Sequence, residues 1–122
     1  MAVLALKELP SPALAPSDDV IDLDHLGRMT LGERSLEREV LVLFGRQAEI
    51  LLPRMQGGSP TLAAATAHTL KGSALGIGAW RVARAAEAVE LADAASMSAA
   101  VEALNGSIEE ARAVIAGLLR AH

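Results

Sequence analysis

The chain has 122 residues, a length typical of one domain, and 52% of them are hydrophobic although only 2% are aromatic. Leucine, valine, isoleucine and many alanines must therefore fill the core, and because alanine and leucine are strong helix formers, the composition predicts an all-α protein. A net charge of −4 argues against a nucleic-acid partner, and the absence of cysteine excludes disulfides and thiolate metal sites.

The N-terminal segment contains Pro10, Pro12 and Pro16 among serine and alanine residues. Prolines at this density prevent regular structure, so we expect a flexible leader over residues 1–17 and one helical domain over residues 18–122. The first residues lack the basic region of a signal peptide, and no stretch reaches about 18 uncharged apolar residues. These features predict a cytoplasmic protein that makes no contact with membranes.

The first two helices are expected over residues 20–26 and about 32–55. Asp18 and Asp19 precede the first, where acidic side chains favour a helix N-terminus. In the second helix, apolar residues recur at steps of three, four and seven, as on one buried face. We expect that face to consist of Leu36, Val40, Leu43, Phe44, Ile50 and Leu51.

Three further helices are expected over about 60–77, 79–94 and 98–120. Ser59 is a suitable N-cap with Pro60 in the first helical position, and Val82, Ala86 and Val89 are expected to face inward from the fourth helix. Asn105-Gly106 is a local break signal, but the apolar residues keep one 3.6-residue phase across it, so the last helix is predicted to be continuous. Four long helices with short loops predict an antiparallel four-helix bundle with a short additional N-terminal helix.

The segment from Ala67 to Gly78 carries the chemistry. At 100° per residue, Thr66, Leu70 and Ile77 lie roughly 160–200° from His68, so they should face the core while His68 faces solvent. On the same exposed side lie Lys71, the small residues Ala64 and Gly72, and Leu75.

This surface has features that stability alone does not favour. Gly72 in the middle of a helix costs about 1 kcal/mol relative to alanine, and an exposed Leu75 gains nothing from folding. Both are useful if the backbone of another protein approaches His68 closely. A neutral imidazole is a competent nucleophile toward phosphorus, and Lys71 can neutralise charge on phosphoryl oxygens. A lone exposed histidine is nevertheless more often an ordinary surface residue.

The string His68-Thr-Leu-Lys71-Gly72-Ser73, with Gly78 following, resembles the signature of histidine phosphotransfer (HPt) domains. Such domains serve multistep two-component phosphorelays and form the N-terminal module of chemotaxis kinases. Residues 21–26 resemble the opening helix of the family and residues 43–48 its second-helix segment, so the resemblance covers about residues 20–119.

The resemblance implies that His68 is the phosphoacceptor and that Lys71 steadies the phosphoryl group. Gly72 would leave room for a receiver domain, and Gly78 would mark the turn into the fourth helix. Carboxylates on the fourth helix of some members orient the histidine. Glu87 and Glu90 are the candidates here, and both could equally be ordinary surface acids. The expected partners are receiver domains of response regulators or hybrid kinases. We expect a monomer that uses no cofactor or metal.

Three alternatives remain. A sensor-kinase dimerisation domain usually has an acidic residue after its histidine, where this chain has Thr69, and no glycine-rich nucleotide-binding segment is present, so we expect no kinase or ATPase activity. A non-catalytic interaction module would use the same docking face without phosphotransfer. A metal site inside the bundle is disfavoured because His68 points outward and has no histidine three or four residues further on.

Four other residues have a less specific interpretation. We expect His25 to be a surface residue and Trp80 to pack under the turn at Gly78. Arg81 and Arg84 could form a basic rim that meets an acidic receiver pocket, or could be solvated surface charges.

Overall fold

The computed structural model describes residues 19–57 and 59–121, and all regular structure in these ranges is helical. The leader expected over residues 1–17 lies outside the described residues. The helices are α1 (Leu23–Met29), α2 (Arg34–Gly57), α3 (Pro60–Ile77), α4 (Trp80–Leu91) and α5 (Met97–Ala121). The all-α prediction is therefore confirmed.

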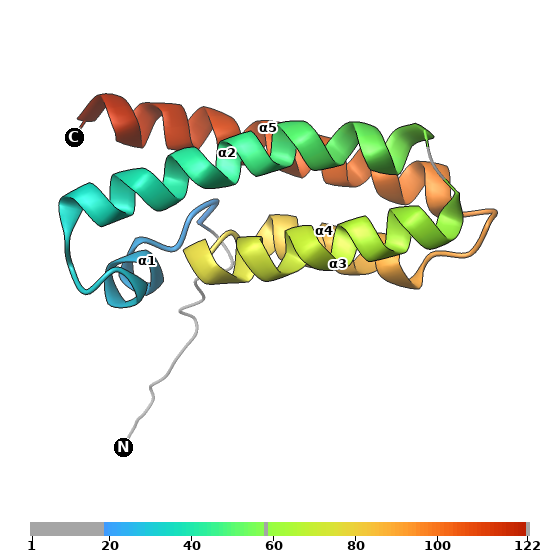
Figure 1. Ribbon diagram of the computed structural model, residues 1–122, viewed down its shortest axis with the longest axis horizontal. Helices are drawn as coiled ribbons and strands as arrows, with labels where there is room; N and C mark the ends of the chain where they lie inside the picture. The colour runs from blue at the N-terminus through green and yellow to red at the C-terminus, as the bar shows by residue number, and fades with distance from the viewer. Residues whose placement is uncertain (1–18, 58, 122) are drawn as a thin grey trace, which may run out of the picture.

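The four long helices form an antiparallel bundle of two layers, with α2 beside α5 and α3 beside α4 (Figure 1). Each long helix packs against the preceding and the following one, and α2 and α5 close the ring. The short α1 contacts α3 at one end of the bundle. No helix in the described ranges is both long enough and apolar enough to cross a bilayer.

The local signals at the ends of α3 are present in the structure. The side chain of Ser59 accepts a hydrogen bond from the Leu62 N–H at 3.2 Å, and Pro60 begins the helix. Gly78 ends α3 with φ 77°, a left-handed conformation in which an L side chain is strained. Helix α3 thus has the bounds that the sequence predicts.

Helix α4 ends at Leu91 instead of continuing to residue 94. Asp93 and Ser96 explain the early end, because their side chains and backbone groups bond reciprocally. Asp93 N–H donates to Ser96 Oγ at 3.1 Å, and Ser96 N–H donates to Asp93 Oδ1 at 2.9 Å. Such local side-chain bonds compete with the helical ones and favour the start of a new helix.

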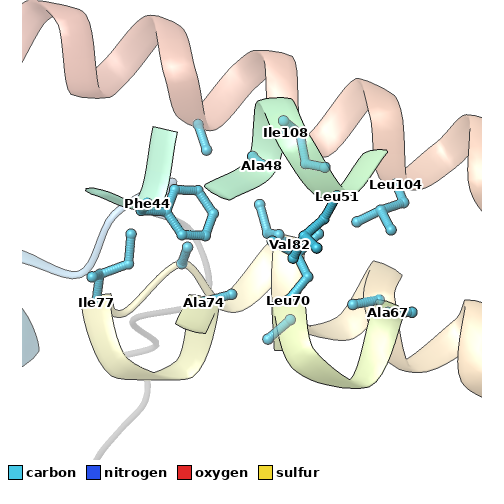
Figure 2. Packing of buried hydrophobic residues seen from close by; sticks show 14 of the residues in the cluster. Phe44, Ala48, Leu51, Ala67, Leu70, Ala74, Ile77, Val82, Leu104 and Ile108 are labelled. Carbon is cyan, nitrogen blue, oxygen red and sulfur yellow. The ribbon is translucent and has the colours of Figure 1, made fainter. Parts of the chain in front are cut away.

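The buried face of α2 differs from the predicted stripe. Phe44 and Leu51 are buried as predicted, but Leu43 and Ile50 are 55% and 57% exposed. The residues of α2 that are buried in the core are Leu41, Phe44, Ala48, Leu51 and Met55. Figure 2 shows Phe44 directed toward the α3 residues around Ala74 and Ile77. Helix α2 has so many apolar positions that several stripes fit its sequence, and only packing against α3 and α5 selects one.

Helix α5 runs without interruption through Asn105 and Gly106. Its buried residues are Val101, Leu104, Ile108, Ala111 and Ile115, in the predicted phase on both sides of the glycine. Burial of this continuous face outweighs the cost of about 1 kcal/mol for a glycine inside a helix.

Helix α1 begins three residues later than predicted, because Asp22 is its N-cap and not part of its first turn. The Asp22 carboxylate accepts from the His25 N–H at 3.1 Å, and the Asp22 N–H donates to the Gly78 carbonyl at 3.0 Å. Ile21, just before the cap, is buried in the core. Asp22 thus attaches α1 to the turn between α3 and α4.

Candidate functional site

His68 lies in the middle of α3 with its side chain 70% exposed. The opposite face of the helix is in the core, where Ala67, Leu70 and Ala74 are fully buried. The helical phase therefore presents the imidazole to solvent, as the sequence predicts.

A carboxylate from the neighbouring helix holds one nitrogen of this imidazole. Glu90 Oε2 of α4 lies 2.7 Å from His68 Nδ1, and Glu90 Oε1 lies 2.7 Å from Lys71 Nζ. Glu90 is the member of the candidate pair that contacts His68, whereas Glu87, one turn earlier, is exposed and makes no such contact. The three residues form one cluster across the α3–α4 interface.

The cluster is sheltered from water on the carboxylate side. The Glu90 side chain is 19% exposed, that of Lys71 is 23% exposed, and Oε1 of Glu90 is buried. The Lys71 ammonium, and secondarily the bond to His68, lowers the pKa of Glu90, while the Glu90 carboxylate raises the pKa of Lys71. Both groups are therefore charged at neutral pH.

The charge of Glu90 determines the tautomer of His68. An ionised carboxylate can only accept a hydrogen bond, so Nδ1 must donate its proton to Glu90. In the neutral ring, Nε2 then carries the lone pair. Nε2 has no hydrogen-bond partner among the residues that the structure describes, so this nitrogen is available to attack an electrophile from solvent.

Small and apolar residues surround the histidine. Gly72 is exposed, and a Cβ added there would meet no atom within 4 Å. Ala64 is half-buried, and Leu75 is 44% exposed. Gly78, in contrast, is buried, and a Cβ there would lie 2.9 Å from Asp22 Cβ. Gly78 thus packs closely against Asp22, the N-cap of α1. It belongs to this buried contact and not to the exposed surface around His68.

The sequence gives little sign of a second cluster beside the first. Trp80 Nε1 donates to Asp22 Oδ2 at 3.0 Å, and the rings of Trp80 and His25 are 4.8 Å apart. His25 is half-buried, and its Nε2 lies 2.9 Å from the Leu75 carbonyl oxygen. His25 is thus no ordinary surface residue, and Trp80 does pack at the Gly78 turn. The sequence signal for Asp22 is its residue type, because aspartate is a preferred N-cap just before a helix.

The two arginines of α4 differ in their surroundings. Arg81 donates to both oxygens of Glu110 on α5 at 3.1 and 3.0 Å, an ion pair that joins two helices. Arg84 is exposed and lines a groove with Lys71 and Leu75. Only Arg84 therefore remains available at the rim of the site. No group of three metal-ligating side chains occurs in the described part of the chain.

An exposed histidine on a four-helix bundle, bonded to a carboxylate of the neighbouring helix, is the arrangement that the resemblance to histidine phosphotransfer domains implies. The model of the Hpt domain family matches residues 39–114, and the chain therefore belongs to this family. The chain is also similar to histidine phosphotransferase ShpA from Caulobacter crescentus, whose crystal structure superimposes with a TM-score of 0.68 at 27% identity. The match covers 84% of this chain and 93% of ShpA. No curated protein sequence matches the chain.

Membership of the family defines the general role. HPt domains are phosphocarriers of two-component phosphorelays and interact with receiver domains, so this chain is a phosphorelay protein.

Proposed function

We propose that His68 Nε2 is the phosphoacceptor, and that the chain carries a phosphoryl group between receiver-domain aspartates through a phosphohistidine intermediate. The observation that carries this proposal is the 2.7 Å contact of His68 Nδ1 with Glu90. It leaves Nε2 as the nucleophilic nitrogen on an exposed ring.

The transfer step is balanced without a co-reactant in this chain. The Nε2 lone pair attacks the phosphorus of a receiver aspartyl phosphate, the N–P bond forms, and the P–O bond to the aspartate breaks. The aspartate leaves as a carboxylate with the bonding electron pair. The His68 ring, still protonated at Nδ1, becomes cationic, and its proton remains in the bond to Glu90. Transfer to the next aspartate reverses these changes.

Glu90 and Lys71 act on different charges in this step. Positive charge develops on the imidazole as the N–P bond forms, and the carboxylate of Glu90 is already in contact with that ring. Lys71 lies one turn from His68, where its ammonium can meet the phosphoryl oxygens while it remains near Glu90. Both side chains are oriented before the reaction, which avoids the cost of reorganisation.

The receiver docks on the surface formed by Ala64, Gly72 and Leu75 around His68. In-line transfer requires the receiver aspartate to reach Nε2, so the two backbones must come close together. The open space above Gly72 permits this approach, and exposed Leu75 supplies apolar contact area. Leu75→Asp should therefore weaken docking with little loss of fold stability.

The chain acts as a monomeric carrier without kinase or ATPase activity of its own. The support is the lack of a glycine-rich nucleotide-binding segment in the sequence. Pure protein incubated with labelled ATP and magnesium should remain unlabelled, and it should sediment as a monomer. Stoichiometric self-labelling would indicate a kinase instead.

Phosphotransfer from the phosphorylated receivers of the same organism tests the assignment of His68. The wild-type chain should take up label in an acid-labile, base-stable bond, and His68→Gln should take up none. Label on the His68→Gln variant would place the phosphoacceptor elsewhere. A receiver that binds the wild-type chain without transferring label would favour a non-catalytic docking module.

A further inference from the structure

A groove between α3 and α4 lies next to the cluster formed by His68, Lys71 and Glu90. Its volume is about 290 Å³, and it is lined by Lys71, Leu75, Trp80, Ala83, Arg84 and Glu87. Lys71 belongs both to this α3–α4 groove and to the cluster with Glu90, so the groove and the cluster are continuous. A protein that brings an aspartate to His68 and contacts Lys71 therefore reaches the edge of this groove.

The groove has an apolar interior and a charged rim. Leu75, Trp80 and Ala83 provide the apolar surface, whereas Lys71, Arg84 and Glu87 provide the charges. Arg84 and Glu87 are exposed, and neither forms an ion pair with another residue in the described ranges. An apolar centre within a polar rim is the usual composition of a protein–protein contact.

The Trp80 ring is fixed before any partner arrives. Asp22 accepts its indole N–H at 3.0 Å, and His25 packs against its ring at a centroid distance of 4.8 Å. His25 in turn contacts the backbone carbonyl of Leu75 at 2.9 Å, so α1 is bonded to α3 beside the groove. A rigid, half-exposed tryptophan loses little entropy on binding, and tryptophan is enriched among residues that dominate binding.

The size of the groove distinguishes between occupants. Pockets for small molecules usually have volumes of about 300–1,000 Å³ and enclose most of the ligand, whereas this groove lies at the lower limit and is open. It suits one side chain of a docked protein better than a free metabolite.

We infer that the receiver inserts one apolar side chain into the α3–α4 groove, and that Arg84 and Glu87 on the rim select which receiver docks. The inference rests on the proposed function of His68, because it assigns the partner by continuity with that residue. Arg84 favours a receiver with an acidic residue beside the inserted side chain, and Glu87 favours one with a basic residue there. Receivers that place a like charge opposite Arg84 or Glu87 are disfavoured.

Fluorescence of Trp80, the single tryptophan of the chain, reports whether the groove is occupied. His68→Gln is titrated with purified receiver domains that lack tryptophan, naturally or after Trp→Phe substitution. We expect a saturable shift of emission to shorter wavelength with the receiver that transfers label to the wild-type chain. Saturable binding without any change in Trp80 emission would overturn the insertion.

Exchange of the two rim charges tests whether Arg84 and Glu87 select between receivers. Arg84→Glu combined with Glu87→Arg preserves the net charge and should lower transfer from the preferred receiver, relative to other receivers, by about tenfold. The matched control exchanges Glu49 and Arg112, whose 2.9 Å ion pair joins α2 and α5, and should leave the preference unchanged. Circular dichroism melts verify that both double variants fold.

The outcomes separate this inference from the proposed function. If the wild-type chain is labelled on His68 but the exchange at Arg84 and Glu87 leaves the preference among receivers unchanged, selection by the rim is wrong and the role of His68 stands. If no receiver labels the wild-type chain, the proposed function itself fails.

Discussion

Glu90 Oε2 lies 2.7 Å from His68 Nδ1, although the two residues are 22 positions apart and on different helices. The contact exists because α4 packs antiparallel to α3 and turns Glu90 toward it. This single carboxylate determines the histidine tautomer and also pairs with Lys71.

Glu90→Gln should slow phosphotransfer on the order of tenfold at saturating receiver. Glutamine keeps an oxygen that can accept a hydrogen bond from the Nδ1–H group but removes the negative charge that stabilises the cationic ring. Rapid-quench measurement of the transfer rate tests this, with exposed Glu102→Gln on α5 as the control. An unchanged rate for Glu90→Gln would limit Glu90 to a structural role.

The contribution of Glu90 to stability should depend on pH. Its pKa is held below the ordinary value of 4.5, mainly by Lys71. A carboxyl with a depressed folded-state pKa stabilises the fold above the unfolded pKa and loses that contribution as the pH falls through the folded pKa. The difference in melting temperature between wild type and Glu90→Gln should therefore shrink as the pH falls below the unfolded pKa and through the lower folded-state pKa of Glu90. A constant difference across this range would contradict the shift.

Lys71→Ala should slow transfer more than it weakens docking. The ammonium meets charge that is present only with the phosphoryl group, so the loss should be about 1–3 kcal/mol in the transfer barrier, or roughly 5- to 150-fold in rate. Transfer kinetics over a range of receiver concentrations separate the maximal rate from the receiver concentration that gives half of this rate. A higher receiver concentration at half the maximal rate, with the maximal rate unchanged, would make Lys71 a docking residue.

Gly72→Gln should abolish transfer and leave the bundle folded. The added side chain has open space above the helix, where it would obstruct the receiver, and glutamine is the better helix former by up to about 1 kcal/mol. The control is Gly106→Gln on α5, which also has open space and should stabilise the fold without affecting transfer. Thermal melts and label transfer are measured on both. Normal transfer by Gly72→Gln would place the docking surface elsewhere.

Gly78→Ala should destabilise the fold more than Gly32→Ala. Both glycines have positive φ, 77° and 72°, so each substitution incurs about 1–2 kcal/mol of backbone strain. Only at Gly78 does the new Cβ also approach Asp22, to 2.9 Å from its Cβ and 3.0 Å from its carbonyl oxygen. That overlap adds about 1–3 kcal/mol. Denaturant unfolding measures the free energy of unfolding of the two variants. Equal losses would mean that Asp22 moves aside at little cost.

The sequence alone determined those features that depend on helical periodicity and local caps. Ser59, Pro60 and Gly78 set the bounds of α3, and the phase of Leu70 and Ile77 against His68 predicts which side faces solvent. The continuity of α5 across Gly106 follows from the same reasoning. These signals act within a few residues along the chain, so no tertiary information is needed to interpret them.

Tertiary packing decided what periodicity leaves open. Glu87 and Glu90 lie one turn apart, and only the rotation of α4 against α3 selects Glu90 as the partner of His68. Leu43 lies on a helix whose apolar residues fit several stripes, and the neighbours of α2 decide which of these stripes is buried. Asp22 meets Trp80 across 58 positions of sequence. Contacts between distant residues depend on how whole helices pack against one another, and no local pattern encodes that geometry.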